Sequence, residues 1–388
     1  KKWKGEEVVK IDFVDLKAQF GEIREEIFKA IEGVIDSQHF ILGPRVEEFE
    51  YNVAAYCQVK HAVGCASGTD ALIISLAATG IGEGDEVITT PFTFFSTASS
   101  ITKVGGKPVF VDIEPASFNI DPYRIERAVT SRTKAVLPVH LFGQMADMDA
   151  ILEIAKRRDL LVIEDAAQAL GSKYLVEKSG NWKKAGTLGT AGCFSFFPTK
   201  NLGGFGDGGM MVTDDDLLAG KMKLLRVHGS AKKYFHKMIG WNSRLDAIQA
   251  VVLDVKLKYL DRWSRERREN ADRYDALFRQ TGLIEDGFIT IPARFQKSSH
   301  IFNQYTLMAK ERDQLRDHLG SKKISTEIYY PIPLHLQECF KYLGYRENDF
   351  PNSERAAHEA LSLPIYPRLP VQSQEMIVET ISGFYRKK

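Results

Sequence analysis

Residues 135–164 read AVLPVHLFGQMADMDAILEIAKRRDLLVIE. Two short apolar runs, at residues 135–140 and 160–164, flank the segment MDAILEIAKR, whose apolar residues recur with the period of a helix. A strand, a helix long enough for a crossover and a second strand predict two parallel neighbours in one sheet. Runs this short and this apolar are typical of strands that helices cover on both faces.

The same alternation extends over residues 60–230. Further apolar runs occupy residues 87–90, 108–113, 193–197 and 210–213, with helical patterns between several of them. This arrangement predicts a doubly wound α/β architecture with a largely parallel sheet.

The C-terminal third follows a different pattern. Residues 243–278 form one long, highly charged helical stretch, which we expect to bridge two domains. A strand at 303–309, a helix at 312–319, a strand at 324–330 and a helical tail predict a smaller α+β domain. We therefore expect a large domain over residues 1–255 and a small one over residues 256–388.

Composition excludes several classes of protein. The chain has 388 residues, of which 44% are hydrophobic and 27% charged, so disordered and fibrous classes are out. Lys and Arg exceed Asp and Glu by one, 52 against 51, which leaves no overall field for nucleic acid or a membrane. No apolar stretch approaches the ~20 residues of a membrane span. Glu6 and Glu7 interrupt the N-terminus where a signal peptide is apolar, so we expect a cytosolic protein.

The four cysteines predict no metal site. Cys57, Cys65, Cys193 and Cys339 lie far apart, without a CxxC pair or a histidine at ligand spacing. Core thiols are the favoured interpretation, and a single catalytic cysteine stays open as the alternative.

A first candidate site is CASGTDAL, residues 65–72. Ser67 precedes an apolar helix, with Gly68 and Thr69 in its first turn. Free N–H groups at a helix N-terminus suit a phosphate, glycine allows a close approach, and hydroxyls add donors. A plain helix cap is the alternative interpretation.

Two further segments carry candidate chemistry. LVIEDAAQ, residues 161–168, ends an apolar run with Asp165, where a carboxylate suits a protonated ring nitrogen or simply caps a loop. GCFSFFPTKN, residues 192–201, holds Ser195 in an apolar run and Lys200 beyond a proline, with GGFGDGG directly after. A desolvated lysine there would attack an aldehyde, and a solvated surface lysine is the alternative.

The combination is more specific than its parts. A phosphate cradle, a ring-nitrogen acid and a Schiff-base lysine, in this order on an α/β sheet, are what pyridoxal 5′-phosphate requires. With SGTDAL, PFTFFST, EDAAQALG, FSFFPTKNLGGFGDGG and GWNSRLDAIQA, the chain resembles the DegT/DnrJ/EryC1/StrS family of nucleotide-sugar aminotransferases from about residue 12 to its last helix. The resemblance implies fold type I, with a mostly parallel seven-stranded sheet and a smaller C-terminal domain.

The resemblance also implies roles for individual residues. Lys200 would be the covalent anchor, Asp165 the partner of the ring nitrogen, Gln168 the neighbour of the phenolic oxygen and Phe94 the stacking ring. The phosphate would be held by Gly68, Thr69 and Ser195. Asn242 would reach the cofactor of the second subunit in a homodimer with shared active sites.

Substrate residues are expected from two segments. Arg244 suits a substrate carboxylate or phosphate, with a helix-surface position as the alternative. The segment YYPIPLHLQ, residues 329–337, contributes Tyr329, Tyr330 and His335, and Tyr329 stands where related ketosugar aminotransferases usually have histidine.

The implied function is transfer of an amino group from L-glutamate to a keto nucleotide sugar. NSRLD resembles enzymes that act at C3, either on a UDP-2-acetamido-3-keto sugar or on a dTDP-3-keto-6-deoxyhexose, in a pathway to a lipopolysaccharide O-antigen, another cell-surface sugar or an antibiotic. The alternatives are a 4-keto-sugar aminotransferase, a sugar dehydratase, in which histidine typically replaces the lysine, and a non-catalytic sensor on the same fold.

Overall fold

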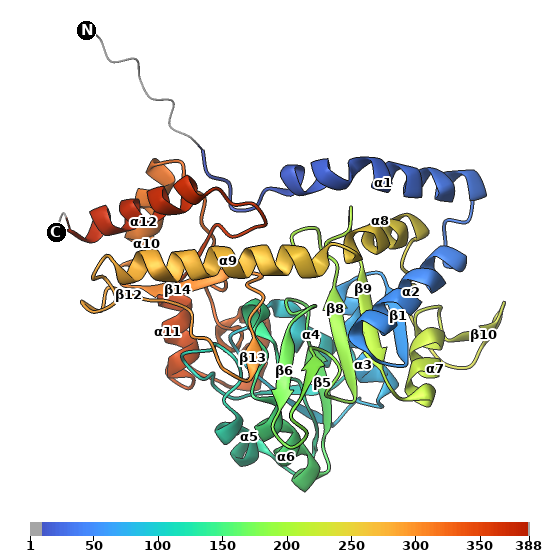
Figure 1. The fold of residues 1–388 in the computed structure, drawn as a ribbon. Coiled ribbons are helices and arrows are strands. Elements are labelled where there is room, and N and C mark those ends of the chain that lie inside the picture. The colour runs from blue at the N-terminus through green and yellow to red at the C-terminus, as the bar shows by residue number, and fades with distance from the viewer. Residues whose placement is uncertain (1–9, 387–388) are drawn as a thin grey trace.

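The computed structural model describes residues 10–386 (Figure 1). Glu6 and Glu7, on which the expected cytosolic location depends, lie outside the described residues. The α-helices are α1 (Leu16–Ser37), α2 (Pro44–Cys57), α3 (Gly68–Ala78), α4 (Phe95–Lys103), α5 (Pro122–Ala128), α6 (Met148–Arg158), α7 (Asp216–Leu225), α8 (Ala247–Leu257), α9 (Leu260–Arg279), α10 (Arg312–Ser321), α11 (Pro351–Glu359) and α12 (Val371–Arg386). Short 3-10 helices are η1 (Leu141–Gly143), η2 (Leu334–Leu336) and η3 (Glu338–Leu343).

The strands form one large sheet and three small ones. They are β1 (His61–Cys65), β2 (Glu86–Thr89), β3 (Lys107–Phe110), β4 (Thr133–Val136), β5 (Leu161–Asp165), β6 (Lys173–Val176), β7 (Asn181–Lys184), β8 (Ala191–Ser195), β9 (Gly209–Thr213), β10 (Ser230–Lys232), β11 (Phe235–His236), β12 (Ile289–Thr290), β13 (Ser298–Ser299), β14 (Tyr305–Ala309) and β15 (Ala360–Leu363).

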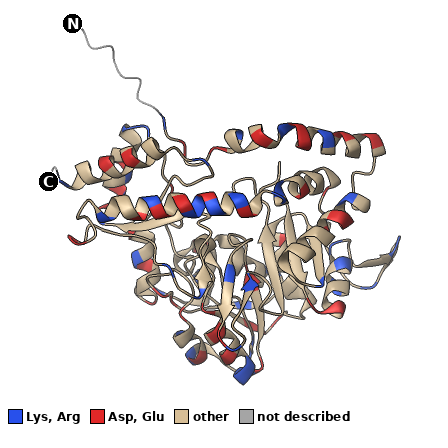
Figure 2. Cartoon of the chain, viewed as in Figure 1, with Lys and Arg blue, Asp and Glu red and all other residues tan. Residues whose placement is uncertain are grey.

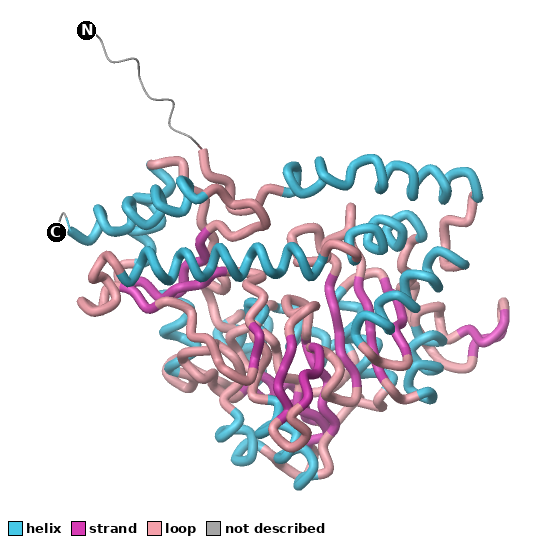
Figure 3. The backbone as a smooth tube through the Cα atoms, in the orientation of Figure 1, coloured by secondary structure: helices cyan, strands magenta, loops and turns pink. Residues whose placement is uncertain are grey.

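The large sheet confirms the predicted architecture. Its seven strands run in the order β1-β9-β8-β5-β4-β2-β3, and helices surround it (Figure 3). The four pairs from β8 to β3 are parallel, while β9 is antiparallel to both of its neighbours. β4 and β5 pair in parallel through Ala135 with Leu161 and Val136 with Val162, as the helical segment between them predicts.

The crossover helix α6 shows why this segment folds as predicted. The Asp147 side chain caps its first turn by accepting from the Ala150 N–H. Met148, Ile151 and Ile154 are buried on its inner face, so the apolar stripe packs on the sheet.

Two elements differ from the expectations in their presence or extent. β1 was not predicted, because Gly64 interrupts a five-residue apolar run; a Cβ there would lie 3.1 Å from the Leu245 Cδ2 atom, so the packing favours glycine. Residues 243–278 form two helices, α8 and α9, rather than one. The Tyr259 N–H donates to the Lys256 carbonyl three residues back, which tightens the turn between them.

The strand predicted at residues 324–330 is wrong. This segment forms isolated bridges only, Ile324 with Ile11 and Glu327 with Ser362. β15 pairs with β14 instead. Pro331 and Pro333 follow the segment and cannot donate to a ladder, and Tyr329 and Tyr330 line a cavity rather than a sheet face.

The described chain holds several separate hydrophobic cores, and α9 contributes residues to more than one of them. One includes Tyr274, Leu307, Leu363 and Ile377 from the C-terminal third, and it also takes in Ile11 from the N-terminus. The larger cores surround the seven-stranded sheet. The division at residue 255 stays a prediction.

Charge is concentrated on the outer helices. Figure 2 shows α1 and α9 carrying both signs, whereas the strands of the large sheet are mostly uncharged. Within residues 10–386, no helix combines the length and apolarity of a membrane span.

Candidate active site

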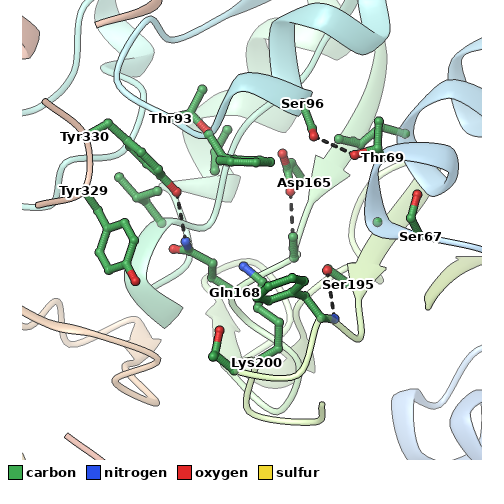
Figure 4. Close-up of a pocket in the computed structure, with 18 of the residues that line it drawn as sticks. Ser67, Thr69, Thr93, Ser96, Asp165, Gln168, Ser195, Lys200, Tyr329 and Tyr330 are labelled. Carbon is green, nitrogen blue, oxygen red and sulfur yellow. Dashed lines mark hydrogen bonds between the residues drawn. The ribbon is translucent and has the colours of Figure 1, made fainter. Parts of the chain in front are cut away.

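A cavity of about 590 Å³ opens at the carboxyl ends of β5 and β8 (Figure 4). Parallel strands place these ends at one edge of the sheet, which is where open α/β sheets bind ligands. Most of the expected site residues line this cavity: Gly68, Thr69, Phe94, Asp165, Gln168, Ser195, Lys200, Tyr329 and Tyr330. Asn242, Arg244 and His335 are not among its lining residues.

The N-terminus of α3 forms one end of the cavity. The helix cap is confirmed, because the Ser67 hydroxyl accepts from the Asp70 N–H at 3.1 Å. The first turn also lines the cavity, and its role as a phosphate site stays a prediction. Thr69 Oγ1 lies 2.6 Å from Ser96 Oγ. A Cβ on Gly68 would lie 2.6 Å from the Ser195 Cβ, so only glycine allows this close approach. The helix N-terminus and three hydroxyls together suit a phosphate.

Asp165 ends β5 and is almost completely buried. Its Oδ2 accepts a hydrogen bond from Thr97 Oγ1 at 2.8 Å, and its Oδ1 accepts from the Ala167 N–H at 3.2 Å. Burial raises the pKa of the Asp165 carboxyl, against these hydrogen bonds and the nearby charge of Lys200. A cationic partner in the cavity would therefore strengthen the ionised form.

Lys200 lies in the turn that follows β8. The backbone N–H of Lys200 donates to the Phe197 carbonyl at 2.8 Å. A Cβ on the nearby Gly203 would lie 2.2 Å from the Pro198 carbonyl oxygen, so this tight loop requires glycine. Burial lowers the pKa of the Lys200 amine to about 8, and the charge of Asp165 opposes that shift. The side chain is not the solvated surface lysine of the alternative interpretation, and its amine is a nucleophile near neutral pH.

Gln168 and two aromatic residues form the opposite wall. Gln168 Oε1 accepts from the Phe142 N–H at 2.7 Å, and its Nε2 donates to the Tyr330 hydroxyl at 3.2 Å. Phe94 precedes α4, and its half-exposed ring lies 6.1 Å from that of Tyr330. In Figure 4, Gln168, Asp165 and Lys200 point into the same space.

The remaining expected residues lie elsewhere. His335 is fully buried, with its Nε2 3.1 Å from Glu354 Oε1, so the structure does not bring it to the cavity. Asn242 pairs with Val227 in the loop that precedes α8. Arg244 lies two residues further on, and its buried Nε has no hydrogen-bond partner within residues 10–386.

Three hydroxyl residues of one motif near the site were not predicted. Thr93 and Ser96 line the cavity, and Thr97 contacts Asp165 from behind it. All three belong to PFTFFST, residues 91–97, from which only Phe94 was singled out. These hydroxyls could have been noticed in the sequence, because the motif holds three of them directly after an apolar strand and nothing else accounts for them there.

The residues fit pyridoxal 5′-phosphate part by part. The α3 terminus and the Gly68 approach suit its phosphate, Asp165 suits its ring nitrogen, and Lys200 suits its aldehyde carbon. Phe94 offers an apolar ring face beside them. No group of histidine, cysteine and carboxylate residues within residues 10–386 is arranged to hold a metal ion.

Comparison with known proteins supports the same conclusion. A pleiotropic regulatory protein of Geobacillus stearothermophilus is 52% identical over 97% of this chain and 99% of its own length. The UDP-N-acetyl-3-dehydro-alpha-D-glucosamine 3-aminotransferase of Acidithiobacillus ferrooxidans is 43% identical over 92% and 94%. The crystal structure of S. venezuelae DesV with a ketimine intermediate is 40% identical and superposes with a TM-score of 0.91 over 97% of this chain and 98% of that one.

The model of the DegT/DnrJ/EryC1/StrS aminotransferase family matches residues 21–382. That match spans the large sheet, the cavity and nearly all of the C-terminal part. The chain therefore belongs to the DegT/DnrJ/EryC1/StrS aminotransferase family, whose enzymes depend on pyridoxal 5′-phosphate.

Proposed function

We propose that this protein transfers the amino group of L-glutamate to C3 of a keto nucleotide sugar. The observation that carries the proposal is the buried Lys200 amine, with a pKa of about 8, in one cavity with Asp165 and Gln168. When bound, pyridoxal phosphate supplies an aldehyde that condenses with amines and a ring that takes up electrons from a breaking C–H bond.

The chain's own residues then have separate tasks. Lys200 Nζ holds the cofactor between turnovers and, once displaced, carries the proton to or from the reacting carbon. The Asp165 carboxylate keeps a proton on the ring nitrogen, because opposite charges within hydrogen-bond reach favour both ionised forms. Gln168 fixes the cofactor's orientation, and Phe94 covers one face of the ring.

C3 is favoured over C4 on two grounds. The NSRLD wording resembles enzymes that act on 3-keto sugars, and the relative from Acidithiobacillus ferrooxidans is named for amination at C3 of a UDP-N-acetyl sugar. We place the UDP-linked 2-acetamido sugar first. The dTDP-linked 3-keto-6-deoxyhexose is the second candidate, because the neutral side chains of Tyr329 and Tyr330 suit a methyl or hydroxymethyl group.

Two other functions on this fold fit less well. A sugar dehydratase of the family typically has histidine where this chain has Lys200. The relative from Geobacillus stearothermophilus is named a pleiotropic regulatory protein. A non-catalytic sensor has no need of a lysine with a lowered pKa facing a buried carboxylate.

We also propose a homodimer with shared sites, which supplies charges that this cavity needs. Lys200 is the one cation among the residues that line the cavity, so the carboxylates of glutamate and the diphosphate would find no further cationic partner in that lining. Arg244 has an unpartnered guanidinium nitrogen, and Asn242 lies beside it. The β10–β11 hairpin nearby projects from the molecule with Tyr234 and Phe235 exposed, as a segment that docks on a second copy would (Figure 1).

The expected setting is amino-sugar biosynthesis in the cytoplasm, for a cell-surface polysaccharide such as an O-antigen or for an antibiotic. The cysteines support a reducing compartment: all four are free thiols, and Cys57, Cys65 and Cys193 are buried.

The decisive assay incubates the protein, pyridoxal phosphate and glutamate with 3-keto and 4-keto sugars linked to UDP or dTDP. NMR then locates the new amine. Amination at C3 of the UDP-acetamido sugar is the expected result. Amination at C4 alone contradicts the regiochemistry, and C3 amination of the dTDP sugar alone reverses the order of the two candidates.

A further inference from the structure

Two threonines of α4 and its preceding turn connect the cavity to Asp165. Thr97 is fully buried and donates its hydroxyl hydrogen to Asp165 Oδ2 at 2.8 Å. Its Oγ1 also lies 2.9 Å from Thr93 Oγ1. Thr93 lines the cavity, whereas Thr97 lies behind Asp165 and outside the lining.

The direction of these hydrogen bonds follows from the number of hydrogens. A threonine hydroxyl has one hydrogen to donate, and an ionised carboxylate can only accept. When Asp165 is ionised, the Thr97 hydrogen is committed to Oδ2. The Thr97 oxygen then accepts from Thr93, so the order is Thr93 to Thr97 to Asp165. When Asp165 is protonated, its carboxyl can donate a hydrogen itself, so Thr97 no longer has to donate to it.

The carboxylate is otherwise held by its backbone. The Asp165 N–H donates to the Pro138 carbonyl at 2.9 Å, and the Asp165 carbonyl accepts from the His140 N–H at 3.0 Å. These contacts fix the end of β5 but leave the side-chain torsion free. The Ala167 N–H reaches Oδ1 and Thr97 reaches Oδ2, so one donor on each oxygen sets the plane of the carboxylate.

We propose that Thr97 is a positioning residue: it orients Asp165 toward the ring nitrogen of the cofactor and favours its ionised form, with Thr93 supporting it. The inference rests on the proposed function, because it concerns the carboxylate that would bind the ring. Thr97 is not among the residues that line the cavity, so in this proposal it acts only through Asp165.

Burial makes this support necessary. Desolvation raises the pKa of Asp165, and the Thr97 hydroxyl is the largest of the contacts that oppose it. The other titratable groups that face Asp165 are Lys200 and His140, whose charges favour the carboxylate, and the Tyr330 hydroxyl and the Cys193 thiol. Of the two direct donors, Ala167 donates from its backbone, so Thr97 is the one that substitution can remove.

The test compares Thr97→Val, which has nearly the same shape but no donor, with Thr97→Ser, which keeps the donor. Thr93→Val removes only the second link. Thr102→Val, on an exposed position of the same helix, is the matched control. The readouts are the pH midpoint of the absorption spectrum of the bound cofactor, the affinity for pyridoxal phosphate, and kcat with the KM for glutamate.

Thr97→Val should move the spectral midpoint to higher pH by about one unit. Without the Thr97 donor, Asp165 is less ionised and the ring nitrogen is less protonated. The ring then carries less positive charge, so the pKa of the nitrogen that joins Lys200 to the cofactor rises. We expect kcat to fall about tenfold, with KM for glutamate within about twofold. Thr97→Ser should restore most of both values, Thr93→Val should shift the midpoint less, and Thr102→Val should match the unmodified protein.

The Asp165→Asn background separates this role from a structural one. If Thr97 acts through Asp165, Thr97→Val adds no further shift there. Equal damage by Thr97→Val and Thr97→Ser, a wild-type midpoint in Thr97→Val, or an added shift in the Asp165→Asn background would overturn the inference. If Thr97→Val does not fold, Thr93→Val takes its place as the test. A spectral midpoint unchanged from the wild type in Thr93→Val would then overturn the inference. A wild-type protein that binds no pyridoxal phosphate contradicts the proposed function instead, which keeps the two failures distinct.

Discussion

The two sides of the cavity differ in how complete they are. On the cofactor side, the hydroxyls of Thr69 and Ser195, the Asp165 carboxylate and the Gln168 amide all have hydrogen-bond partners within the described chain. On the substrate side, neutral aromatic rings line the wall. Arg244, whose Nε has no hydrogen-bond partner within residues 10–386, lies outside it.

In the homodimer that we propose, this difference separates what one chain supplies from what the second copy would add. Regular secondary structure positions the residues of the cofactor side. The ends of β5 and β8 and the starts of α3 and α4 meet there within one chain. The substrate side depends on the irregular segment before Pro331 and on the loop that carries Asn242. We therefore expect substitutions on the cofactor side to have larger effects, and those on the substrate side to change specificity.

Of the substitutions on the cofactor side, Lys200→Ala should cause the largest loss of turnover. Without the amine, neither covalent attachment nor proton transfer at the substrate carbon has a carrier, so we expect turnover to fall by at least about 10³-fold. Steady-state kinetics with glutamate measure the loss. Lys183→Ala, at an exposed position of β7, is the matched control and should retain full activity. Borohydride reduction and peptide mapping should place the pyridoxyl group on Lys200, and a label on another lysine would falsify the assignment.

Asp165→Asn tests the carboxylate with the smallest change of shape. The amide keeps one acceptor oxygen, replaces the other with a donor, and loses the charge that holds a proton on the ring nitrogen. We expect the cofactor to stay bound and kcat to fall by roughly 10²-fold to 10³-fold. Absorbance of the bound cofactor and kcat are measured on the same sample. Near-normal turnover with full occupancy would remove Asp165 from the chemistry.

The pH dependence of cofactor capture tests the lowered pKa of Lys200. Only the neutral amine attacks an aldehyde, so below its pKa of about 8 the rate for cofactor-free protein should rise about tenfold per pH unit. Above that pH the rate should level off. Asp165→Asn removes the charge that raises this pKa and should move the plateau to lower pH. A rate that still rises between pH 9 and 10 would show an ordinary lysine.

Periodicity and strand ends were sufficient to predict most of the fold. The apolar runs at 135–140 and 160–164 predicted β4 and β5, because a buried parallel strand reads as a continuous apolar run. The same criterion failed at residues 324–330, where apolar residues serve a cavity wall. It also missed β1, whose run Gly64 interrupts. An apolar run indicates that its side chains are buried. It does not indicate whether they pack in a sheet or line a cavity.

The candidate site was predictable where one residue has one chemical task. Lys200, Asp165 and Gln168 follow strands and reach the cavity as expected. Thr97 escaped notice because it acts through another residue, and nothing in its own spacing marks such a contact. His335 was expected near the substrate from its motif alone, but burial against Glu354 takes it into the interior.

Mixing two inactive variants tests whether the substrate side needs a second copy. If Lys200 and Asn242 serve one site from different chains, a mixed dimer of Lys200→Ala and Asn242→Ala contains one intact site. Random exchange places half of the chains in mixed dimers, so activity should return to about a quarter of the wild-type value. Native mass spectrometry confirms the exchange. Exchange without recovered activity would assign Asn242 to the site of its own chain.

The smallest expected effect concerns Tyr329 and the charge of the sugar. Its half-buried hydroxyl is neutral, since burial and the charge of Glu327 both raise its pKa. Tyr329→His places a group there that accepts a proton, and Glu327 favours the protonated ring. Turnover of a 3-keto uronate relative to a 3-keto hexose should then rise roughly threefold to tenfold, because a partly exposed ion pair contributes about 1 kcal/mol. Tyr329→Phe separates charge from loss of the hydroxyl, and it should leave the ratio near that of the wild type. The ratio for Tyr329→His should fall back above about pH 7, when the imidazole loses its proton. Equal ratios for the two variants at pH 6 would mean that position 329 does not meet the charged end of the sugar, and the preference would then lie with residues of the second copy.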